Sequence, residues 1–220
     1  MIGGGAASAR LLIPEIGEYP KGIGVQLTGI EREHAQTTIV RHHYMHSVPS
    51  GKSVYVAYEA ALVVWSIPAN CNIGKFLLWE GAKVWELSRL WAPDGHHPAL
   101  LTMAISAAIG IINALERPAL LVSYADPNAG HRGGVYRAAS WVFDGQTEST
   151  RMYLRDGSEV PRRAFHSGSR GMTKAQIEAQ GFVEVYRPGK FRFVKPLSHR
   201  AKREVAERQL RNVNATESGG

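Results

Sequence analysis

The chain has 220 residues, 44% of them hydrophobic, and a formal net charge of +7, which fits one α/β domain with a modest extension. A single cysteine, Cys71, excludes an internal disulfide framework, and the N-terminus lacks a signal-peptide pattern. No apolar run is long enough to span a bilayer, so we expect a soluble protein in a reducing cytoplasm.

The first half of the chain predicts alternating strands and helices. Residues 1–20, which begin with a Gly/Ala-rich stretch, predict a flexible N-terminal segment. Acidic residues in the first turn favour a helix at 31–41, and β-branched and aromatic residues at 53–67 favour two strands with a turn near Glu59. Further expected elements are a strand at 23–27, an ambiguous segment or short helix at 71–79, and an alternating strand at 82–91.

The middle of the chain predicts a strand–helix–strand unit. Pro98 opens a long helix that ends near Glu116, and the apolar run at 117–127 then predicts a buried central strand with an exposed carboxyl end. Such a crossover is right-handed and places polar groups at the strand ends in a ligand crevice. The segment 130–143 begins with glycines and predicts a helix that ends at Asp144.

The last third predicts smaller elements and carries the positive charge. Between Arg151 and Arg211 there are 15 Lys/Arg and 6 Asp/Glu, which indicates either a polyanionic partner or a merely soluble basic surface. We expect a strand at 149–155, a basic loop at 155–172, a helix at 173–180 capped by Thr173, a hairpin around Pro188 and Gly189, and a basic C-terminal helix or tail at 198–220. The proposed phosphate contacts are Arg162, Arg163, Arg170, Lys202 and Arg203.

Chemistry-bearing side chains gather in two places. The stretch RHHYMHSVP, residues 41–49, follows the first helix, and polar residues from Ser123 to His131 follow the central strand. If the two meet, imidazole, phenol and carboxylate groups suit a Zn or Fe(II) site, or equally a general base with a proton relay. Polar loop residues that cap helices and bind water are the third interpretation.

Four ordered segments together resemble the Mom family of phage adenine-modifying proteins. They are RHHYMHSVP, ELSRLWAPDG, SYADPNAGHRGGVYRAASW and GFVEVYRPGKFRFV, and the similarity covers residues 23–196. The resemblance implies an α/β fold of the GCN5-related N-acetyltransferase type, with a central mixed β-sheet flanked by helices, over residues 21–197. It also implies conversion of adenine in DNA to N6-carbamoylmethyladenine, which shields phage DNA from restriction in the host bacterial cytoplasm.

The resemblance assigns roles to particular residues. His43, Tyr44 and Asp126 match the family's catalytic positions, and the same three suggest a metal site with iron as the candidate ion. The donor is expected at Ser123, Tyr124, His131, Gly133, Gly134 and Tyr136, where glycines at a helix start favour an anion or a carbonyl group. Double-stranded DNA is the implied partner, and the sequence leaves a homodimer open.

One segment departs from acetyltransferases that use coenzyme A. Their glycine-rich loop cradles a pyrophosphate, whereas RLWAPDGHHPA, residues 89–99, has one glycine and a proline without an N–H. Coenzyme A is therefore a doubtful cofactor, and glycyl-tRNA is our hypothesis for the donor. The alternatives are an acetyl-CoA-dependent N-acetyltransferase of a small amine and a non-catalytic nucleic-acid-binding module.

Overall fold

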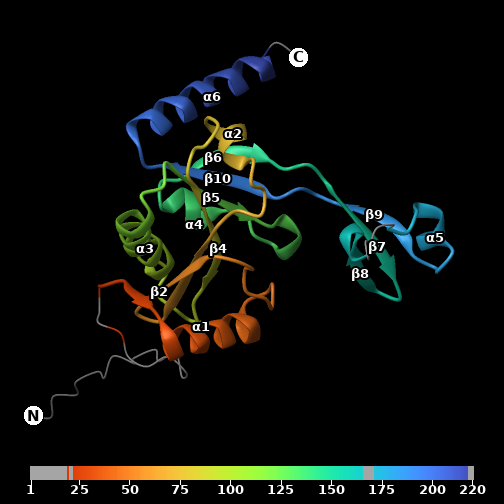
Figure 1. The fold of residues 1–220 in the computed structure, drawn as a ribbon, viewed down its shortest axis with the longest axis horizontal. Coiled ribbons are helices and arrows are strands. Elements are labelled where there is room, and N and C mark those ends of the chain that lie inside the picture. The colour runs from red at the N-terminus through yellow and green to blue at the C-terminus, as the bar shows by residue number, and fades with distance from the viewer. Residues whose placement is uncertain (1–18, 20–21, 166–170, 218–220) are drawn as a thin grey trace, which may run out of the picture.

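The computed structural model describes residue 19 and residues 22–165 and 171–217. A seven-stranded mixed sheet with strand order β1-β2-β3-β4-β5-β10-β6 forms the body, and a three-stranded sheet with order β8-β7-β9 projects from it (Figure 1). The N-terminal elements are β1 (Val25–Leu27), α1 (Gly29–His42), β2 (Ser53–Tyr58), β3 (Ala61–Ser66), α2 (Ile73–Leu77), β4 (Val84–Trp91), α3 (Leu100–Glu116) and β5 (Leu120–Ala125).

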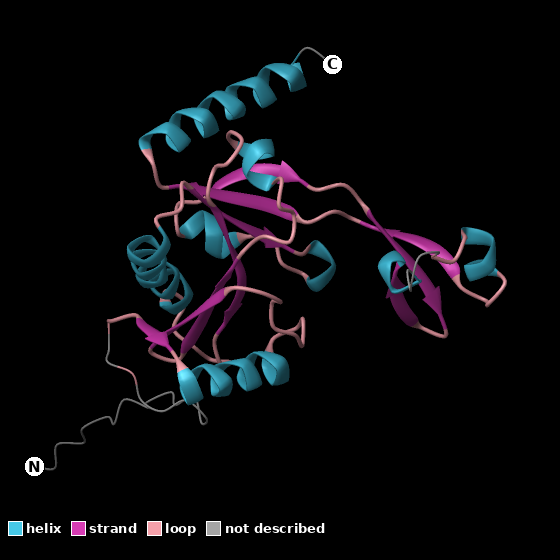
Figure 2. Ribbon diagram, viewed as in Figure 1, coloured by secondary structure: helices cyan, strands magenta, loops and turns pink. Residues whose placement is uncertain are grey.

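The C-terminal elements divide between the two sheets. They are η1 (Pro127–Ala129), α4 (Gly134–Ala138), β6 (Val142–Gln146), β7 (Thr150–Arg155), β8 (Ser158–Pro161), η2 (Arg162–Phe165), α5 (Lys174–Glu178), β9 (Val183–Arg187), β10 (Phe191–Pro196) and α6 (His199–Glu217). Figure 2 shows helices on the periphery of the large sheet. The predicted fold class, a mixed β-sheet flanked by helices, is confirmed.

The strand–helix–strand unit forms as predicted, because β4 and β5 pair in parallel and α3 connects them. Alternate residues of the central strands supply two apolar clusters, as the two-residue period of a strand requires. Leu121 and Phe193 belong to the cluster under α1 and α3, whereas Val122 and Val194 belong to the cluster that also contains Val205 of α6.

The predicted hairpin around Pro188 and Gly189 is wrong. β9 pairs with β7 in the small sheet, and β10 pairs with β5 and β6 in the large one. The chain therefore crosses between the sheets in extended form instead of turning back. It runs beside residue Thr147, whose N–H donates to Lys190 O at 2.9 Å, and a Cβ on Gly189 would lie 1.7 Å from Thr147 O.

Two further boundaries differ from the prediction. The helix expected to end at Asp144 ends at Ala138, and Ser140 then takes a positive φ of 59° before β6 begins. Residues 142–146 pair with β10, so tertiary strand pairing overrides the local helical pattern. The expected basic loop at 155–172 contains β8 and η2.

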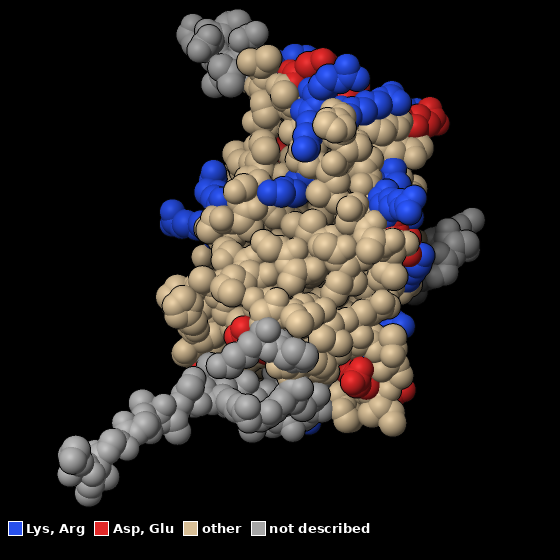
Figure 3. Space-filling view, turned by 90° about the vertical axis from the view of Figure 1, so that its left-hand side faces the viewer, with Lys and Arg blue, Asp and Glu red and all other residues tan. Residues whose placement is uncertain are grey.

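A buried ionic group holds α6 against the body. Asp144 accepts hydrogen bonds from Arg192 Nε at 2.7 Å and from Arg208 Nε at 2.9 Å. Both guanidinium groups also lie over the Phe76 ring, at 5.0 and 4.5 Å from its centroid. This network fixes the inner side of α6, and Figure 3 shows Lys and Arg side chains gathered at the end of the molecule where α6 lies.

Candidate functional site

The site lies where two parallel strands separate. β4 and β5 pair from Val84 and Leu120 as far as Leu87 and Ser123, and β4 then continues to Trp91 without β5. Because the register of β4 against β3 shifts after Leu87, Ser88 is an extra residue on β4. Such a bulge bends a strand, and here a cavity of about 320 Å³ opens beside it.

The loop after α1 brings His43 and Tyr44 into this cavity. His43 ends the helix, with its N–H donating to Ile39 O at 3.0 Å, and His46 adopts a positive φ of 45°. Arg89 of β4 fixes the loop, because its Nε donates to Ser47 O at 2.8 Å and its Nη2 to Ser47 Oγ at 3.1 Å. The tight loop therefore has a defined place against β4.

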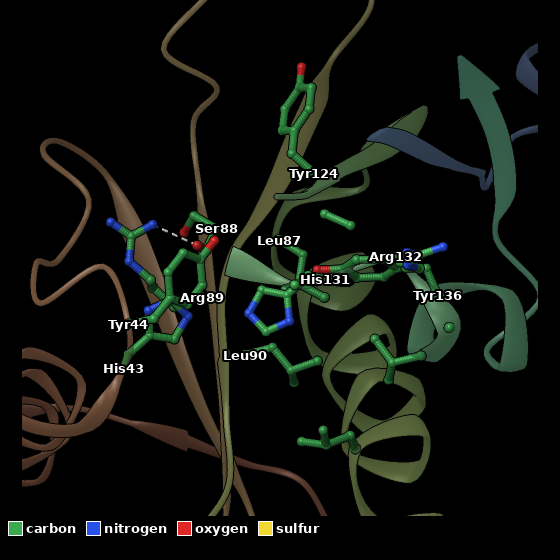
Figure 4. A pocket seen from close by; sticks show the side chains of 16 residues that line it. His43, Tyr44, Leu87, Ser88, Arg89, Leu90, Tyr124, His131, Arg132 and Tyr136 are labelled. Atoms are coloured by element: carbon green, nitrogen blue, oxygen red, sulfur yellow. Dashed lines mark hydrogen bonds between the residues drawn. The ribbon is translucent and has the colours of Figure 1, made fainter. Parts of the chain in front are cut away.

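Three rings form a chain across the cavity. The His43 and Tyr44 centroids lie 4.6 Å apart, and the Tyr44 and His131 centroids 4.9 Å apart. Figure 4 shows His131 entering from the opposite wall, between Leu87 and Leu90. Residues from the loop after α1 and from the loop after β5, almost ninety positions apart in the chain, thus face the same space.

The protonation of these rings is set by their surroundings. His43 Nδ1 accepts a hydrogen bond from the Met45 N–H at 3.1 Å, so its Nε2 carries the proton of the neutral ring. Burial lowers the pKa of His43 to about 4, and nearby Arg89 acts in the same direction. Burial and then Asp126 raise the pKa of Tyr44, against the effect of Arg89. At neutral pH both groups are hydrogen-bond donors rather than bases.

His131 differs from His43 because no hydrogen bond within the described residues holds its ring. Its backbone N–H donates to Asp126 O at 3.0 Å, but in the described part of the chain neither ring nitrogen of His131 has a hydrogen-bond partner. The side chain is exposed to the cavity. A nitrogen lone pair in this position can accept a proton from a bound substrate.

Asp126 lies at the strand end but is committed to other contacts. Its Oδ1 accepts hydrogen bonds from Asn128 N and Nδ2, both at 3.0 Å, and its Oδ2 lies 3.2 Å from Lys190 Nζ. Burial disfavours its charge, yet the bonds from Asn128 and Lys190 outweigh burial and lower its pKa. Asp126 is not among the residues that line the cavity. Through Asn128 and Lys190 it instead connects the loop after β5 to the chain that leads into β10.

The expected donor-binding residues divide into a floor and a rim. Ser123 is fully buried, and its Oγ lies 2.8 Å from both Leu87 O and Tyr136 Oη. Burial raises the pKa of Tyr136 to about 12, so its ring contributes a neutral wall. The Tyr124 side chain points away from His43 and His131, as Figure 4 shows, so this residue lines the cavity mainly through its backbone.

The two expected glycines have different reasons to be glycine. Gly133 has a φ of 76°, and a Cβ there would lie 2.2 Å from the buried Phe193 ring. Gly134 meets nothing within 4 Å and lines the cavity. A larger residue at position 133 would therefore disturb the core, and of these two glycines Gly134 is the one whose backbone a ligand can approach closely.

His43, Tyr44 and Asp126 do not fit an iron site in this arrangement. A metal at His43 Nε2 would move the ring proton to Nδ1, where it would face the Met45 N–H. Both Asp126 oxygens already have partners. Over residues 22–165 and 171–217, no group of three His, Cys, Asp or Glu is placed to hold a metal ion.

The expected nucleic-acid contacts also divide. Lys202 and Arg203 are exposed on α6. Arg162 is partly buried, and its Nη1 donates to Met172 O at 2.8 Å, so it stabilises the small sheet's loop. The Arg163 side chain and all of Arg170 lie outside the described residues.

Sequence inspection missed Arg89 as a site residue. It lines the cavity and holds the 43–47 loop, yet in the sequence it is one polar position of an alternating strand. The signals for it were its place near a strand end and its inclusion in ELSRLWAPDG, one of the four segments that resemble the Mom family. Trp91 stacks on His42, with ring centroids 5.6 Å apart.

These features define a mixed α/β protein with its ligand cavity at the separation of two parallel central strands. A sequence profile described as the Mom protein family matches residues 25–213, and the chain therefore belongs to the Mom protein family. The chain is 28% identical over 186 residues to the methylcarbamoylase mom of Escherichia phage Mu, a match that covers 81% of this chain and 74% of that protein.

A solved structure is also similar in shape. Arabidopsis thaliana NAA60 in complex with acetyl-CoA matches with a TM-score of 0.47 and 8% identity, over 79% of this chain and 97% of that one. Such low identity gives no indication of a shared ligand. Over the described part of the chain, no helix has the length and apolar character to cross a membrane.

Proposed function

We propose that this protein modifies adenine in double-stranded DNA to N6-carbamoylmethyladenine, in the host bacterial cytoplasm. The observation that carries the proposal is the family match over residues 25–213, together with the relative named methylcarbamoylase. The cavity with the His43, Tyr44 and His131 rings is the proposed reaction site. A paired adenine cannot reach such a cavity, so the base must leave the duplex stack.

The proposed chemistry is a glycyl transfer followed by a rearrangement. Adenine N6 attacks the carbonyl of a glycyl ester, a proton leaves N6, and the alcohol departs, which gives C6–NH–CO–CH2–NH2. The free amine then attacks C6 through a five-membered ring, and the original C6–N bond breaks. The product is C6–NH–CH2–CO–NH2, with no net oxidation and the original N6 as the terminal amide.

Each ring has a role in this scheme. His131, whose ring nitrogens are free among the described residues, accepts the proton that N6 loses. His43 Nε2–H and the Tyr44 hydroxyl donate hydrogen bonds to the oxygen that becomes negative in the tetrahedral intermediate. Asp126 positions the loop that carries His131, through Asn128 and Lys190, rather than acting as the base.

We further propose glycyl-tRNA as the donor. Coenzyme A is less suitable because the amides at the start of α3 are already used: Ala99 N donates to His97 Nδ1 at 3.2 Å and Leu100 N to His97 O at 2.9 Å. This leaves fewer free N–H groups for a pyrophosphate. Tight acetyl-CoA binding would instead favour the N-acetyltransferase alternative.

The test follows two nitrogen atoms. DNA containing deoxyadenosine labelled with ¹⁵N at N6 is incubated with the protein and glycyl-tRNA, and its nucleosides are analysed by mass spectrometry. We expect a new deoxyadenosine adduct whose label lies in the terminal amide, so that amide hydrolysis releases labelled ammonia. A label that stays on the ring-bound nitrogen would refute the rearrangement. Absence of any adduct would favour a non-catalytic module.

A further inference from the structure

A second cavity adjoins the reaction cavity and has no role in the scheme above. It measures about 440 Å³, within the usual range of roughly 300–1,000 Å³ for ligand sites. Gly130 and Arg132 line both cavities, so the loop after β5 is their common wall. The remaining lining residues are Pro127, Arg137, Phe143 and Phe191.

The far wall of this second cavity is aromatic. Phe143 of β6 pairs with Phe193 of β10 across the strands, and the three rings of Phe143, Phe191 and Phe193 form a row on this part of the sheet. Phe193 is fully buried, whereas Phe143 is 36% exposed and lines the cavity. The Arg137 guanidinium lies over the Phe143 ring, 5.2 Å from its centroid, so a base can stack only on the part of the ring that this group leaves exposed. A rigid, partly exposed ring of this kind offers a stacking surface.

The common wall carries a free positive charge. Arg132 is exposed, and no carboxylate lies within ion-pair distance of it over the ranges that the structure describes. Arg192, in contrast, is paired with Asp144. A guanidinium between two cavities is suited to a phosphate that links two groups, one in each cavity.

We propose that the second cavity binds the nucleotide next to the target adenine on the same DNA strand, with its base against Phe143 and the connecting phosphate at Arg132. This deepens the proposed function and rests on it. Two neighbouring nucleotides are joined by one phosphodiester, which matches two cavities that share one wall. The base beside the target would thereby influence which adenines are modified.

The test is a double-mutant cycle in which Phe143 is replaced in the protein and a base next to the adenine is removed from the DNA. A fluorescent single-stranded deoxyoligonucleotide with one adenine among thymines is compared with versions that lack the base 5′ or 3′ of the adenine, using fluorescence anisotropy and the full chain. For the wild-type protein, loss of the base on one side should weaken binding roughly tenfold, as expected for one lost stacking contact. For Phe143→Ala the same loss should have less than about a twofold effect.

Two variants serve as controls for packing and charge. Ile30→Ala removes an exposed apolar side chain from α1, far from β6 in Figure 1, and should keep the full effect of the missing base. Arg132→Gln should keep it too, but should lower the slope of log affinity against log salt by about 0.7, the loss of one phosphate contact. An effect of the missing base that persists in Phe143→Ala overturns the proposal.

The remaining outcomes separate the sources and the two proposals. The same cycle run with a ribo-oligonucleotide distinguishes an RNA strand, and a Phe143-dependent effect found only there overturns the assignment to DNA. DNA binding and adduct formation with no effect of either neighbouring base refute the second cavity alone. If the wild-type protein neither binds DNA nor forms an adduct, the proposed function fails as well.

Discussion

The reaction cavity and the small β8-β7-β9 sheet both contain many titratable side chains, but they use them in opposite ways. In the small sheet the charges pair: Glu184 binds Arg151 and Lys174, and Glu159 binds Arg187. In the cavity His131 and the adjoining Arg132 have no acidic partner among the described residues. A group without a partner in the protein is available to a ligand, so the cavity is the better functional candidate although the small sheet has more charge.

The largest expected effect comes from the free ring in the cavity. His131→Asn should reduce adenine modification by about 10²- to 10⁴-fold, because a positioned general base contributes on that scale. Since the side chain is exposed, the unfolding midpoint should hardly change. The matched control is His34→Asn, an exposed histidine on α1. Adduct yield by mass spectrometry measures both, and equal yields would remove His131 from the mechanism.

The next largest effect comes from substitutions of the adjacent residues Gly133 and Gly134, which distinguish a packing role from contact with a ligand. Gly133→Ala should lower the free energy of unfolding by about 2 kcal/mol or more, because its Cβ meets Phe193 and its φ of 76° disfavours a side chain. Gly134→Ala should leave stability within about 1 kcal/mol of wild type. Urea unfolding measures both. A loss of adduct in Gly134→Ala with normal stability would support close backbone contact with the donor.

The buried imidazole should give stability a specific pH dependence. The pKa of His43 is about 4 in the folded protein, against about 6.5 in an unfolded chain. Between these values the unfolded state binds more protons, so this contribution is complete above about pH 6.5 and is lost as pH falls toward 4. His43→Gln should therefore show a flatter decline of the urea midpoint over that range. Parallel curves for the two proteins would contradict the buried neutral ring.

A smaller effect compares free and paired charges directly. Lys202→Gln with Arg203→Gln removes two exposed cations from α6, and should lower the salt slope of DNA binding by about 2 if both contact phosphates. Arg151→Gln with Lys174→Gln removes two cations paired with Glu184, and should change the slope much less. Affinity measured between 50 and 200 mM salt, roughly, gives both slopes. Equal changes in the two salt slopes would show that cations paired with Glu184 still contact DNA phosphates.

The smallest expected effect is that of a chelator. Because His43 Nδ1 and both Asp126 oxygens are already bonded within the protein, EDTA should change neither the unfolding midpoint nor the adduct yield. Dialysed protein with and without added Fe(II) provides the control. Activity that disappears on chelation and returns with iron would show that these side chains rearrange around a metal.

Local patterns in the sequence correctly predicted most elements of the large sheet. The alternating strand at 82–91, the apolar run at 117–127 and the helix after Pro98 matched β4, β5 and α3, because side-chain period and capping are read from neighbours in the chain. The sequence also singled out His43 and Tyr44, since such groups are uncommon in a loop. Thr173 caps α5 as predicted, and its side chain accepts a hydrogen bond from Gln176 N.

Only the tertiary structure decided which elements meet. The segment at 142–146 is a strand because it pairs with β10. β9 and β10 lie in different sheets because β9 pairs with β7, whereas β10 pairs with β5 and β6. Non-local contacts also paired Asp126 with Lys190, whereas the His131 ring faces the cavity without a hydrogen-bond partner among the described residues. The residues next to Asp126 and His131 in the sequence do not predict this difference. Function here depends on which polar groups remain without a partner, and partners are assigned by folding rather than by sequence position.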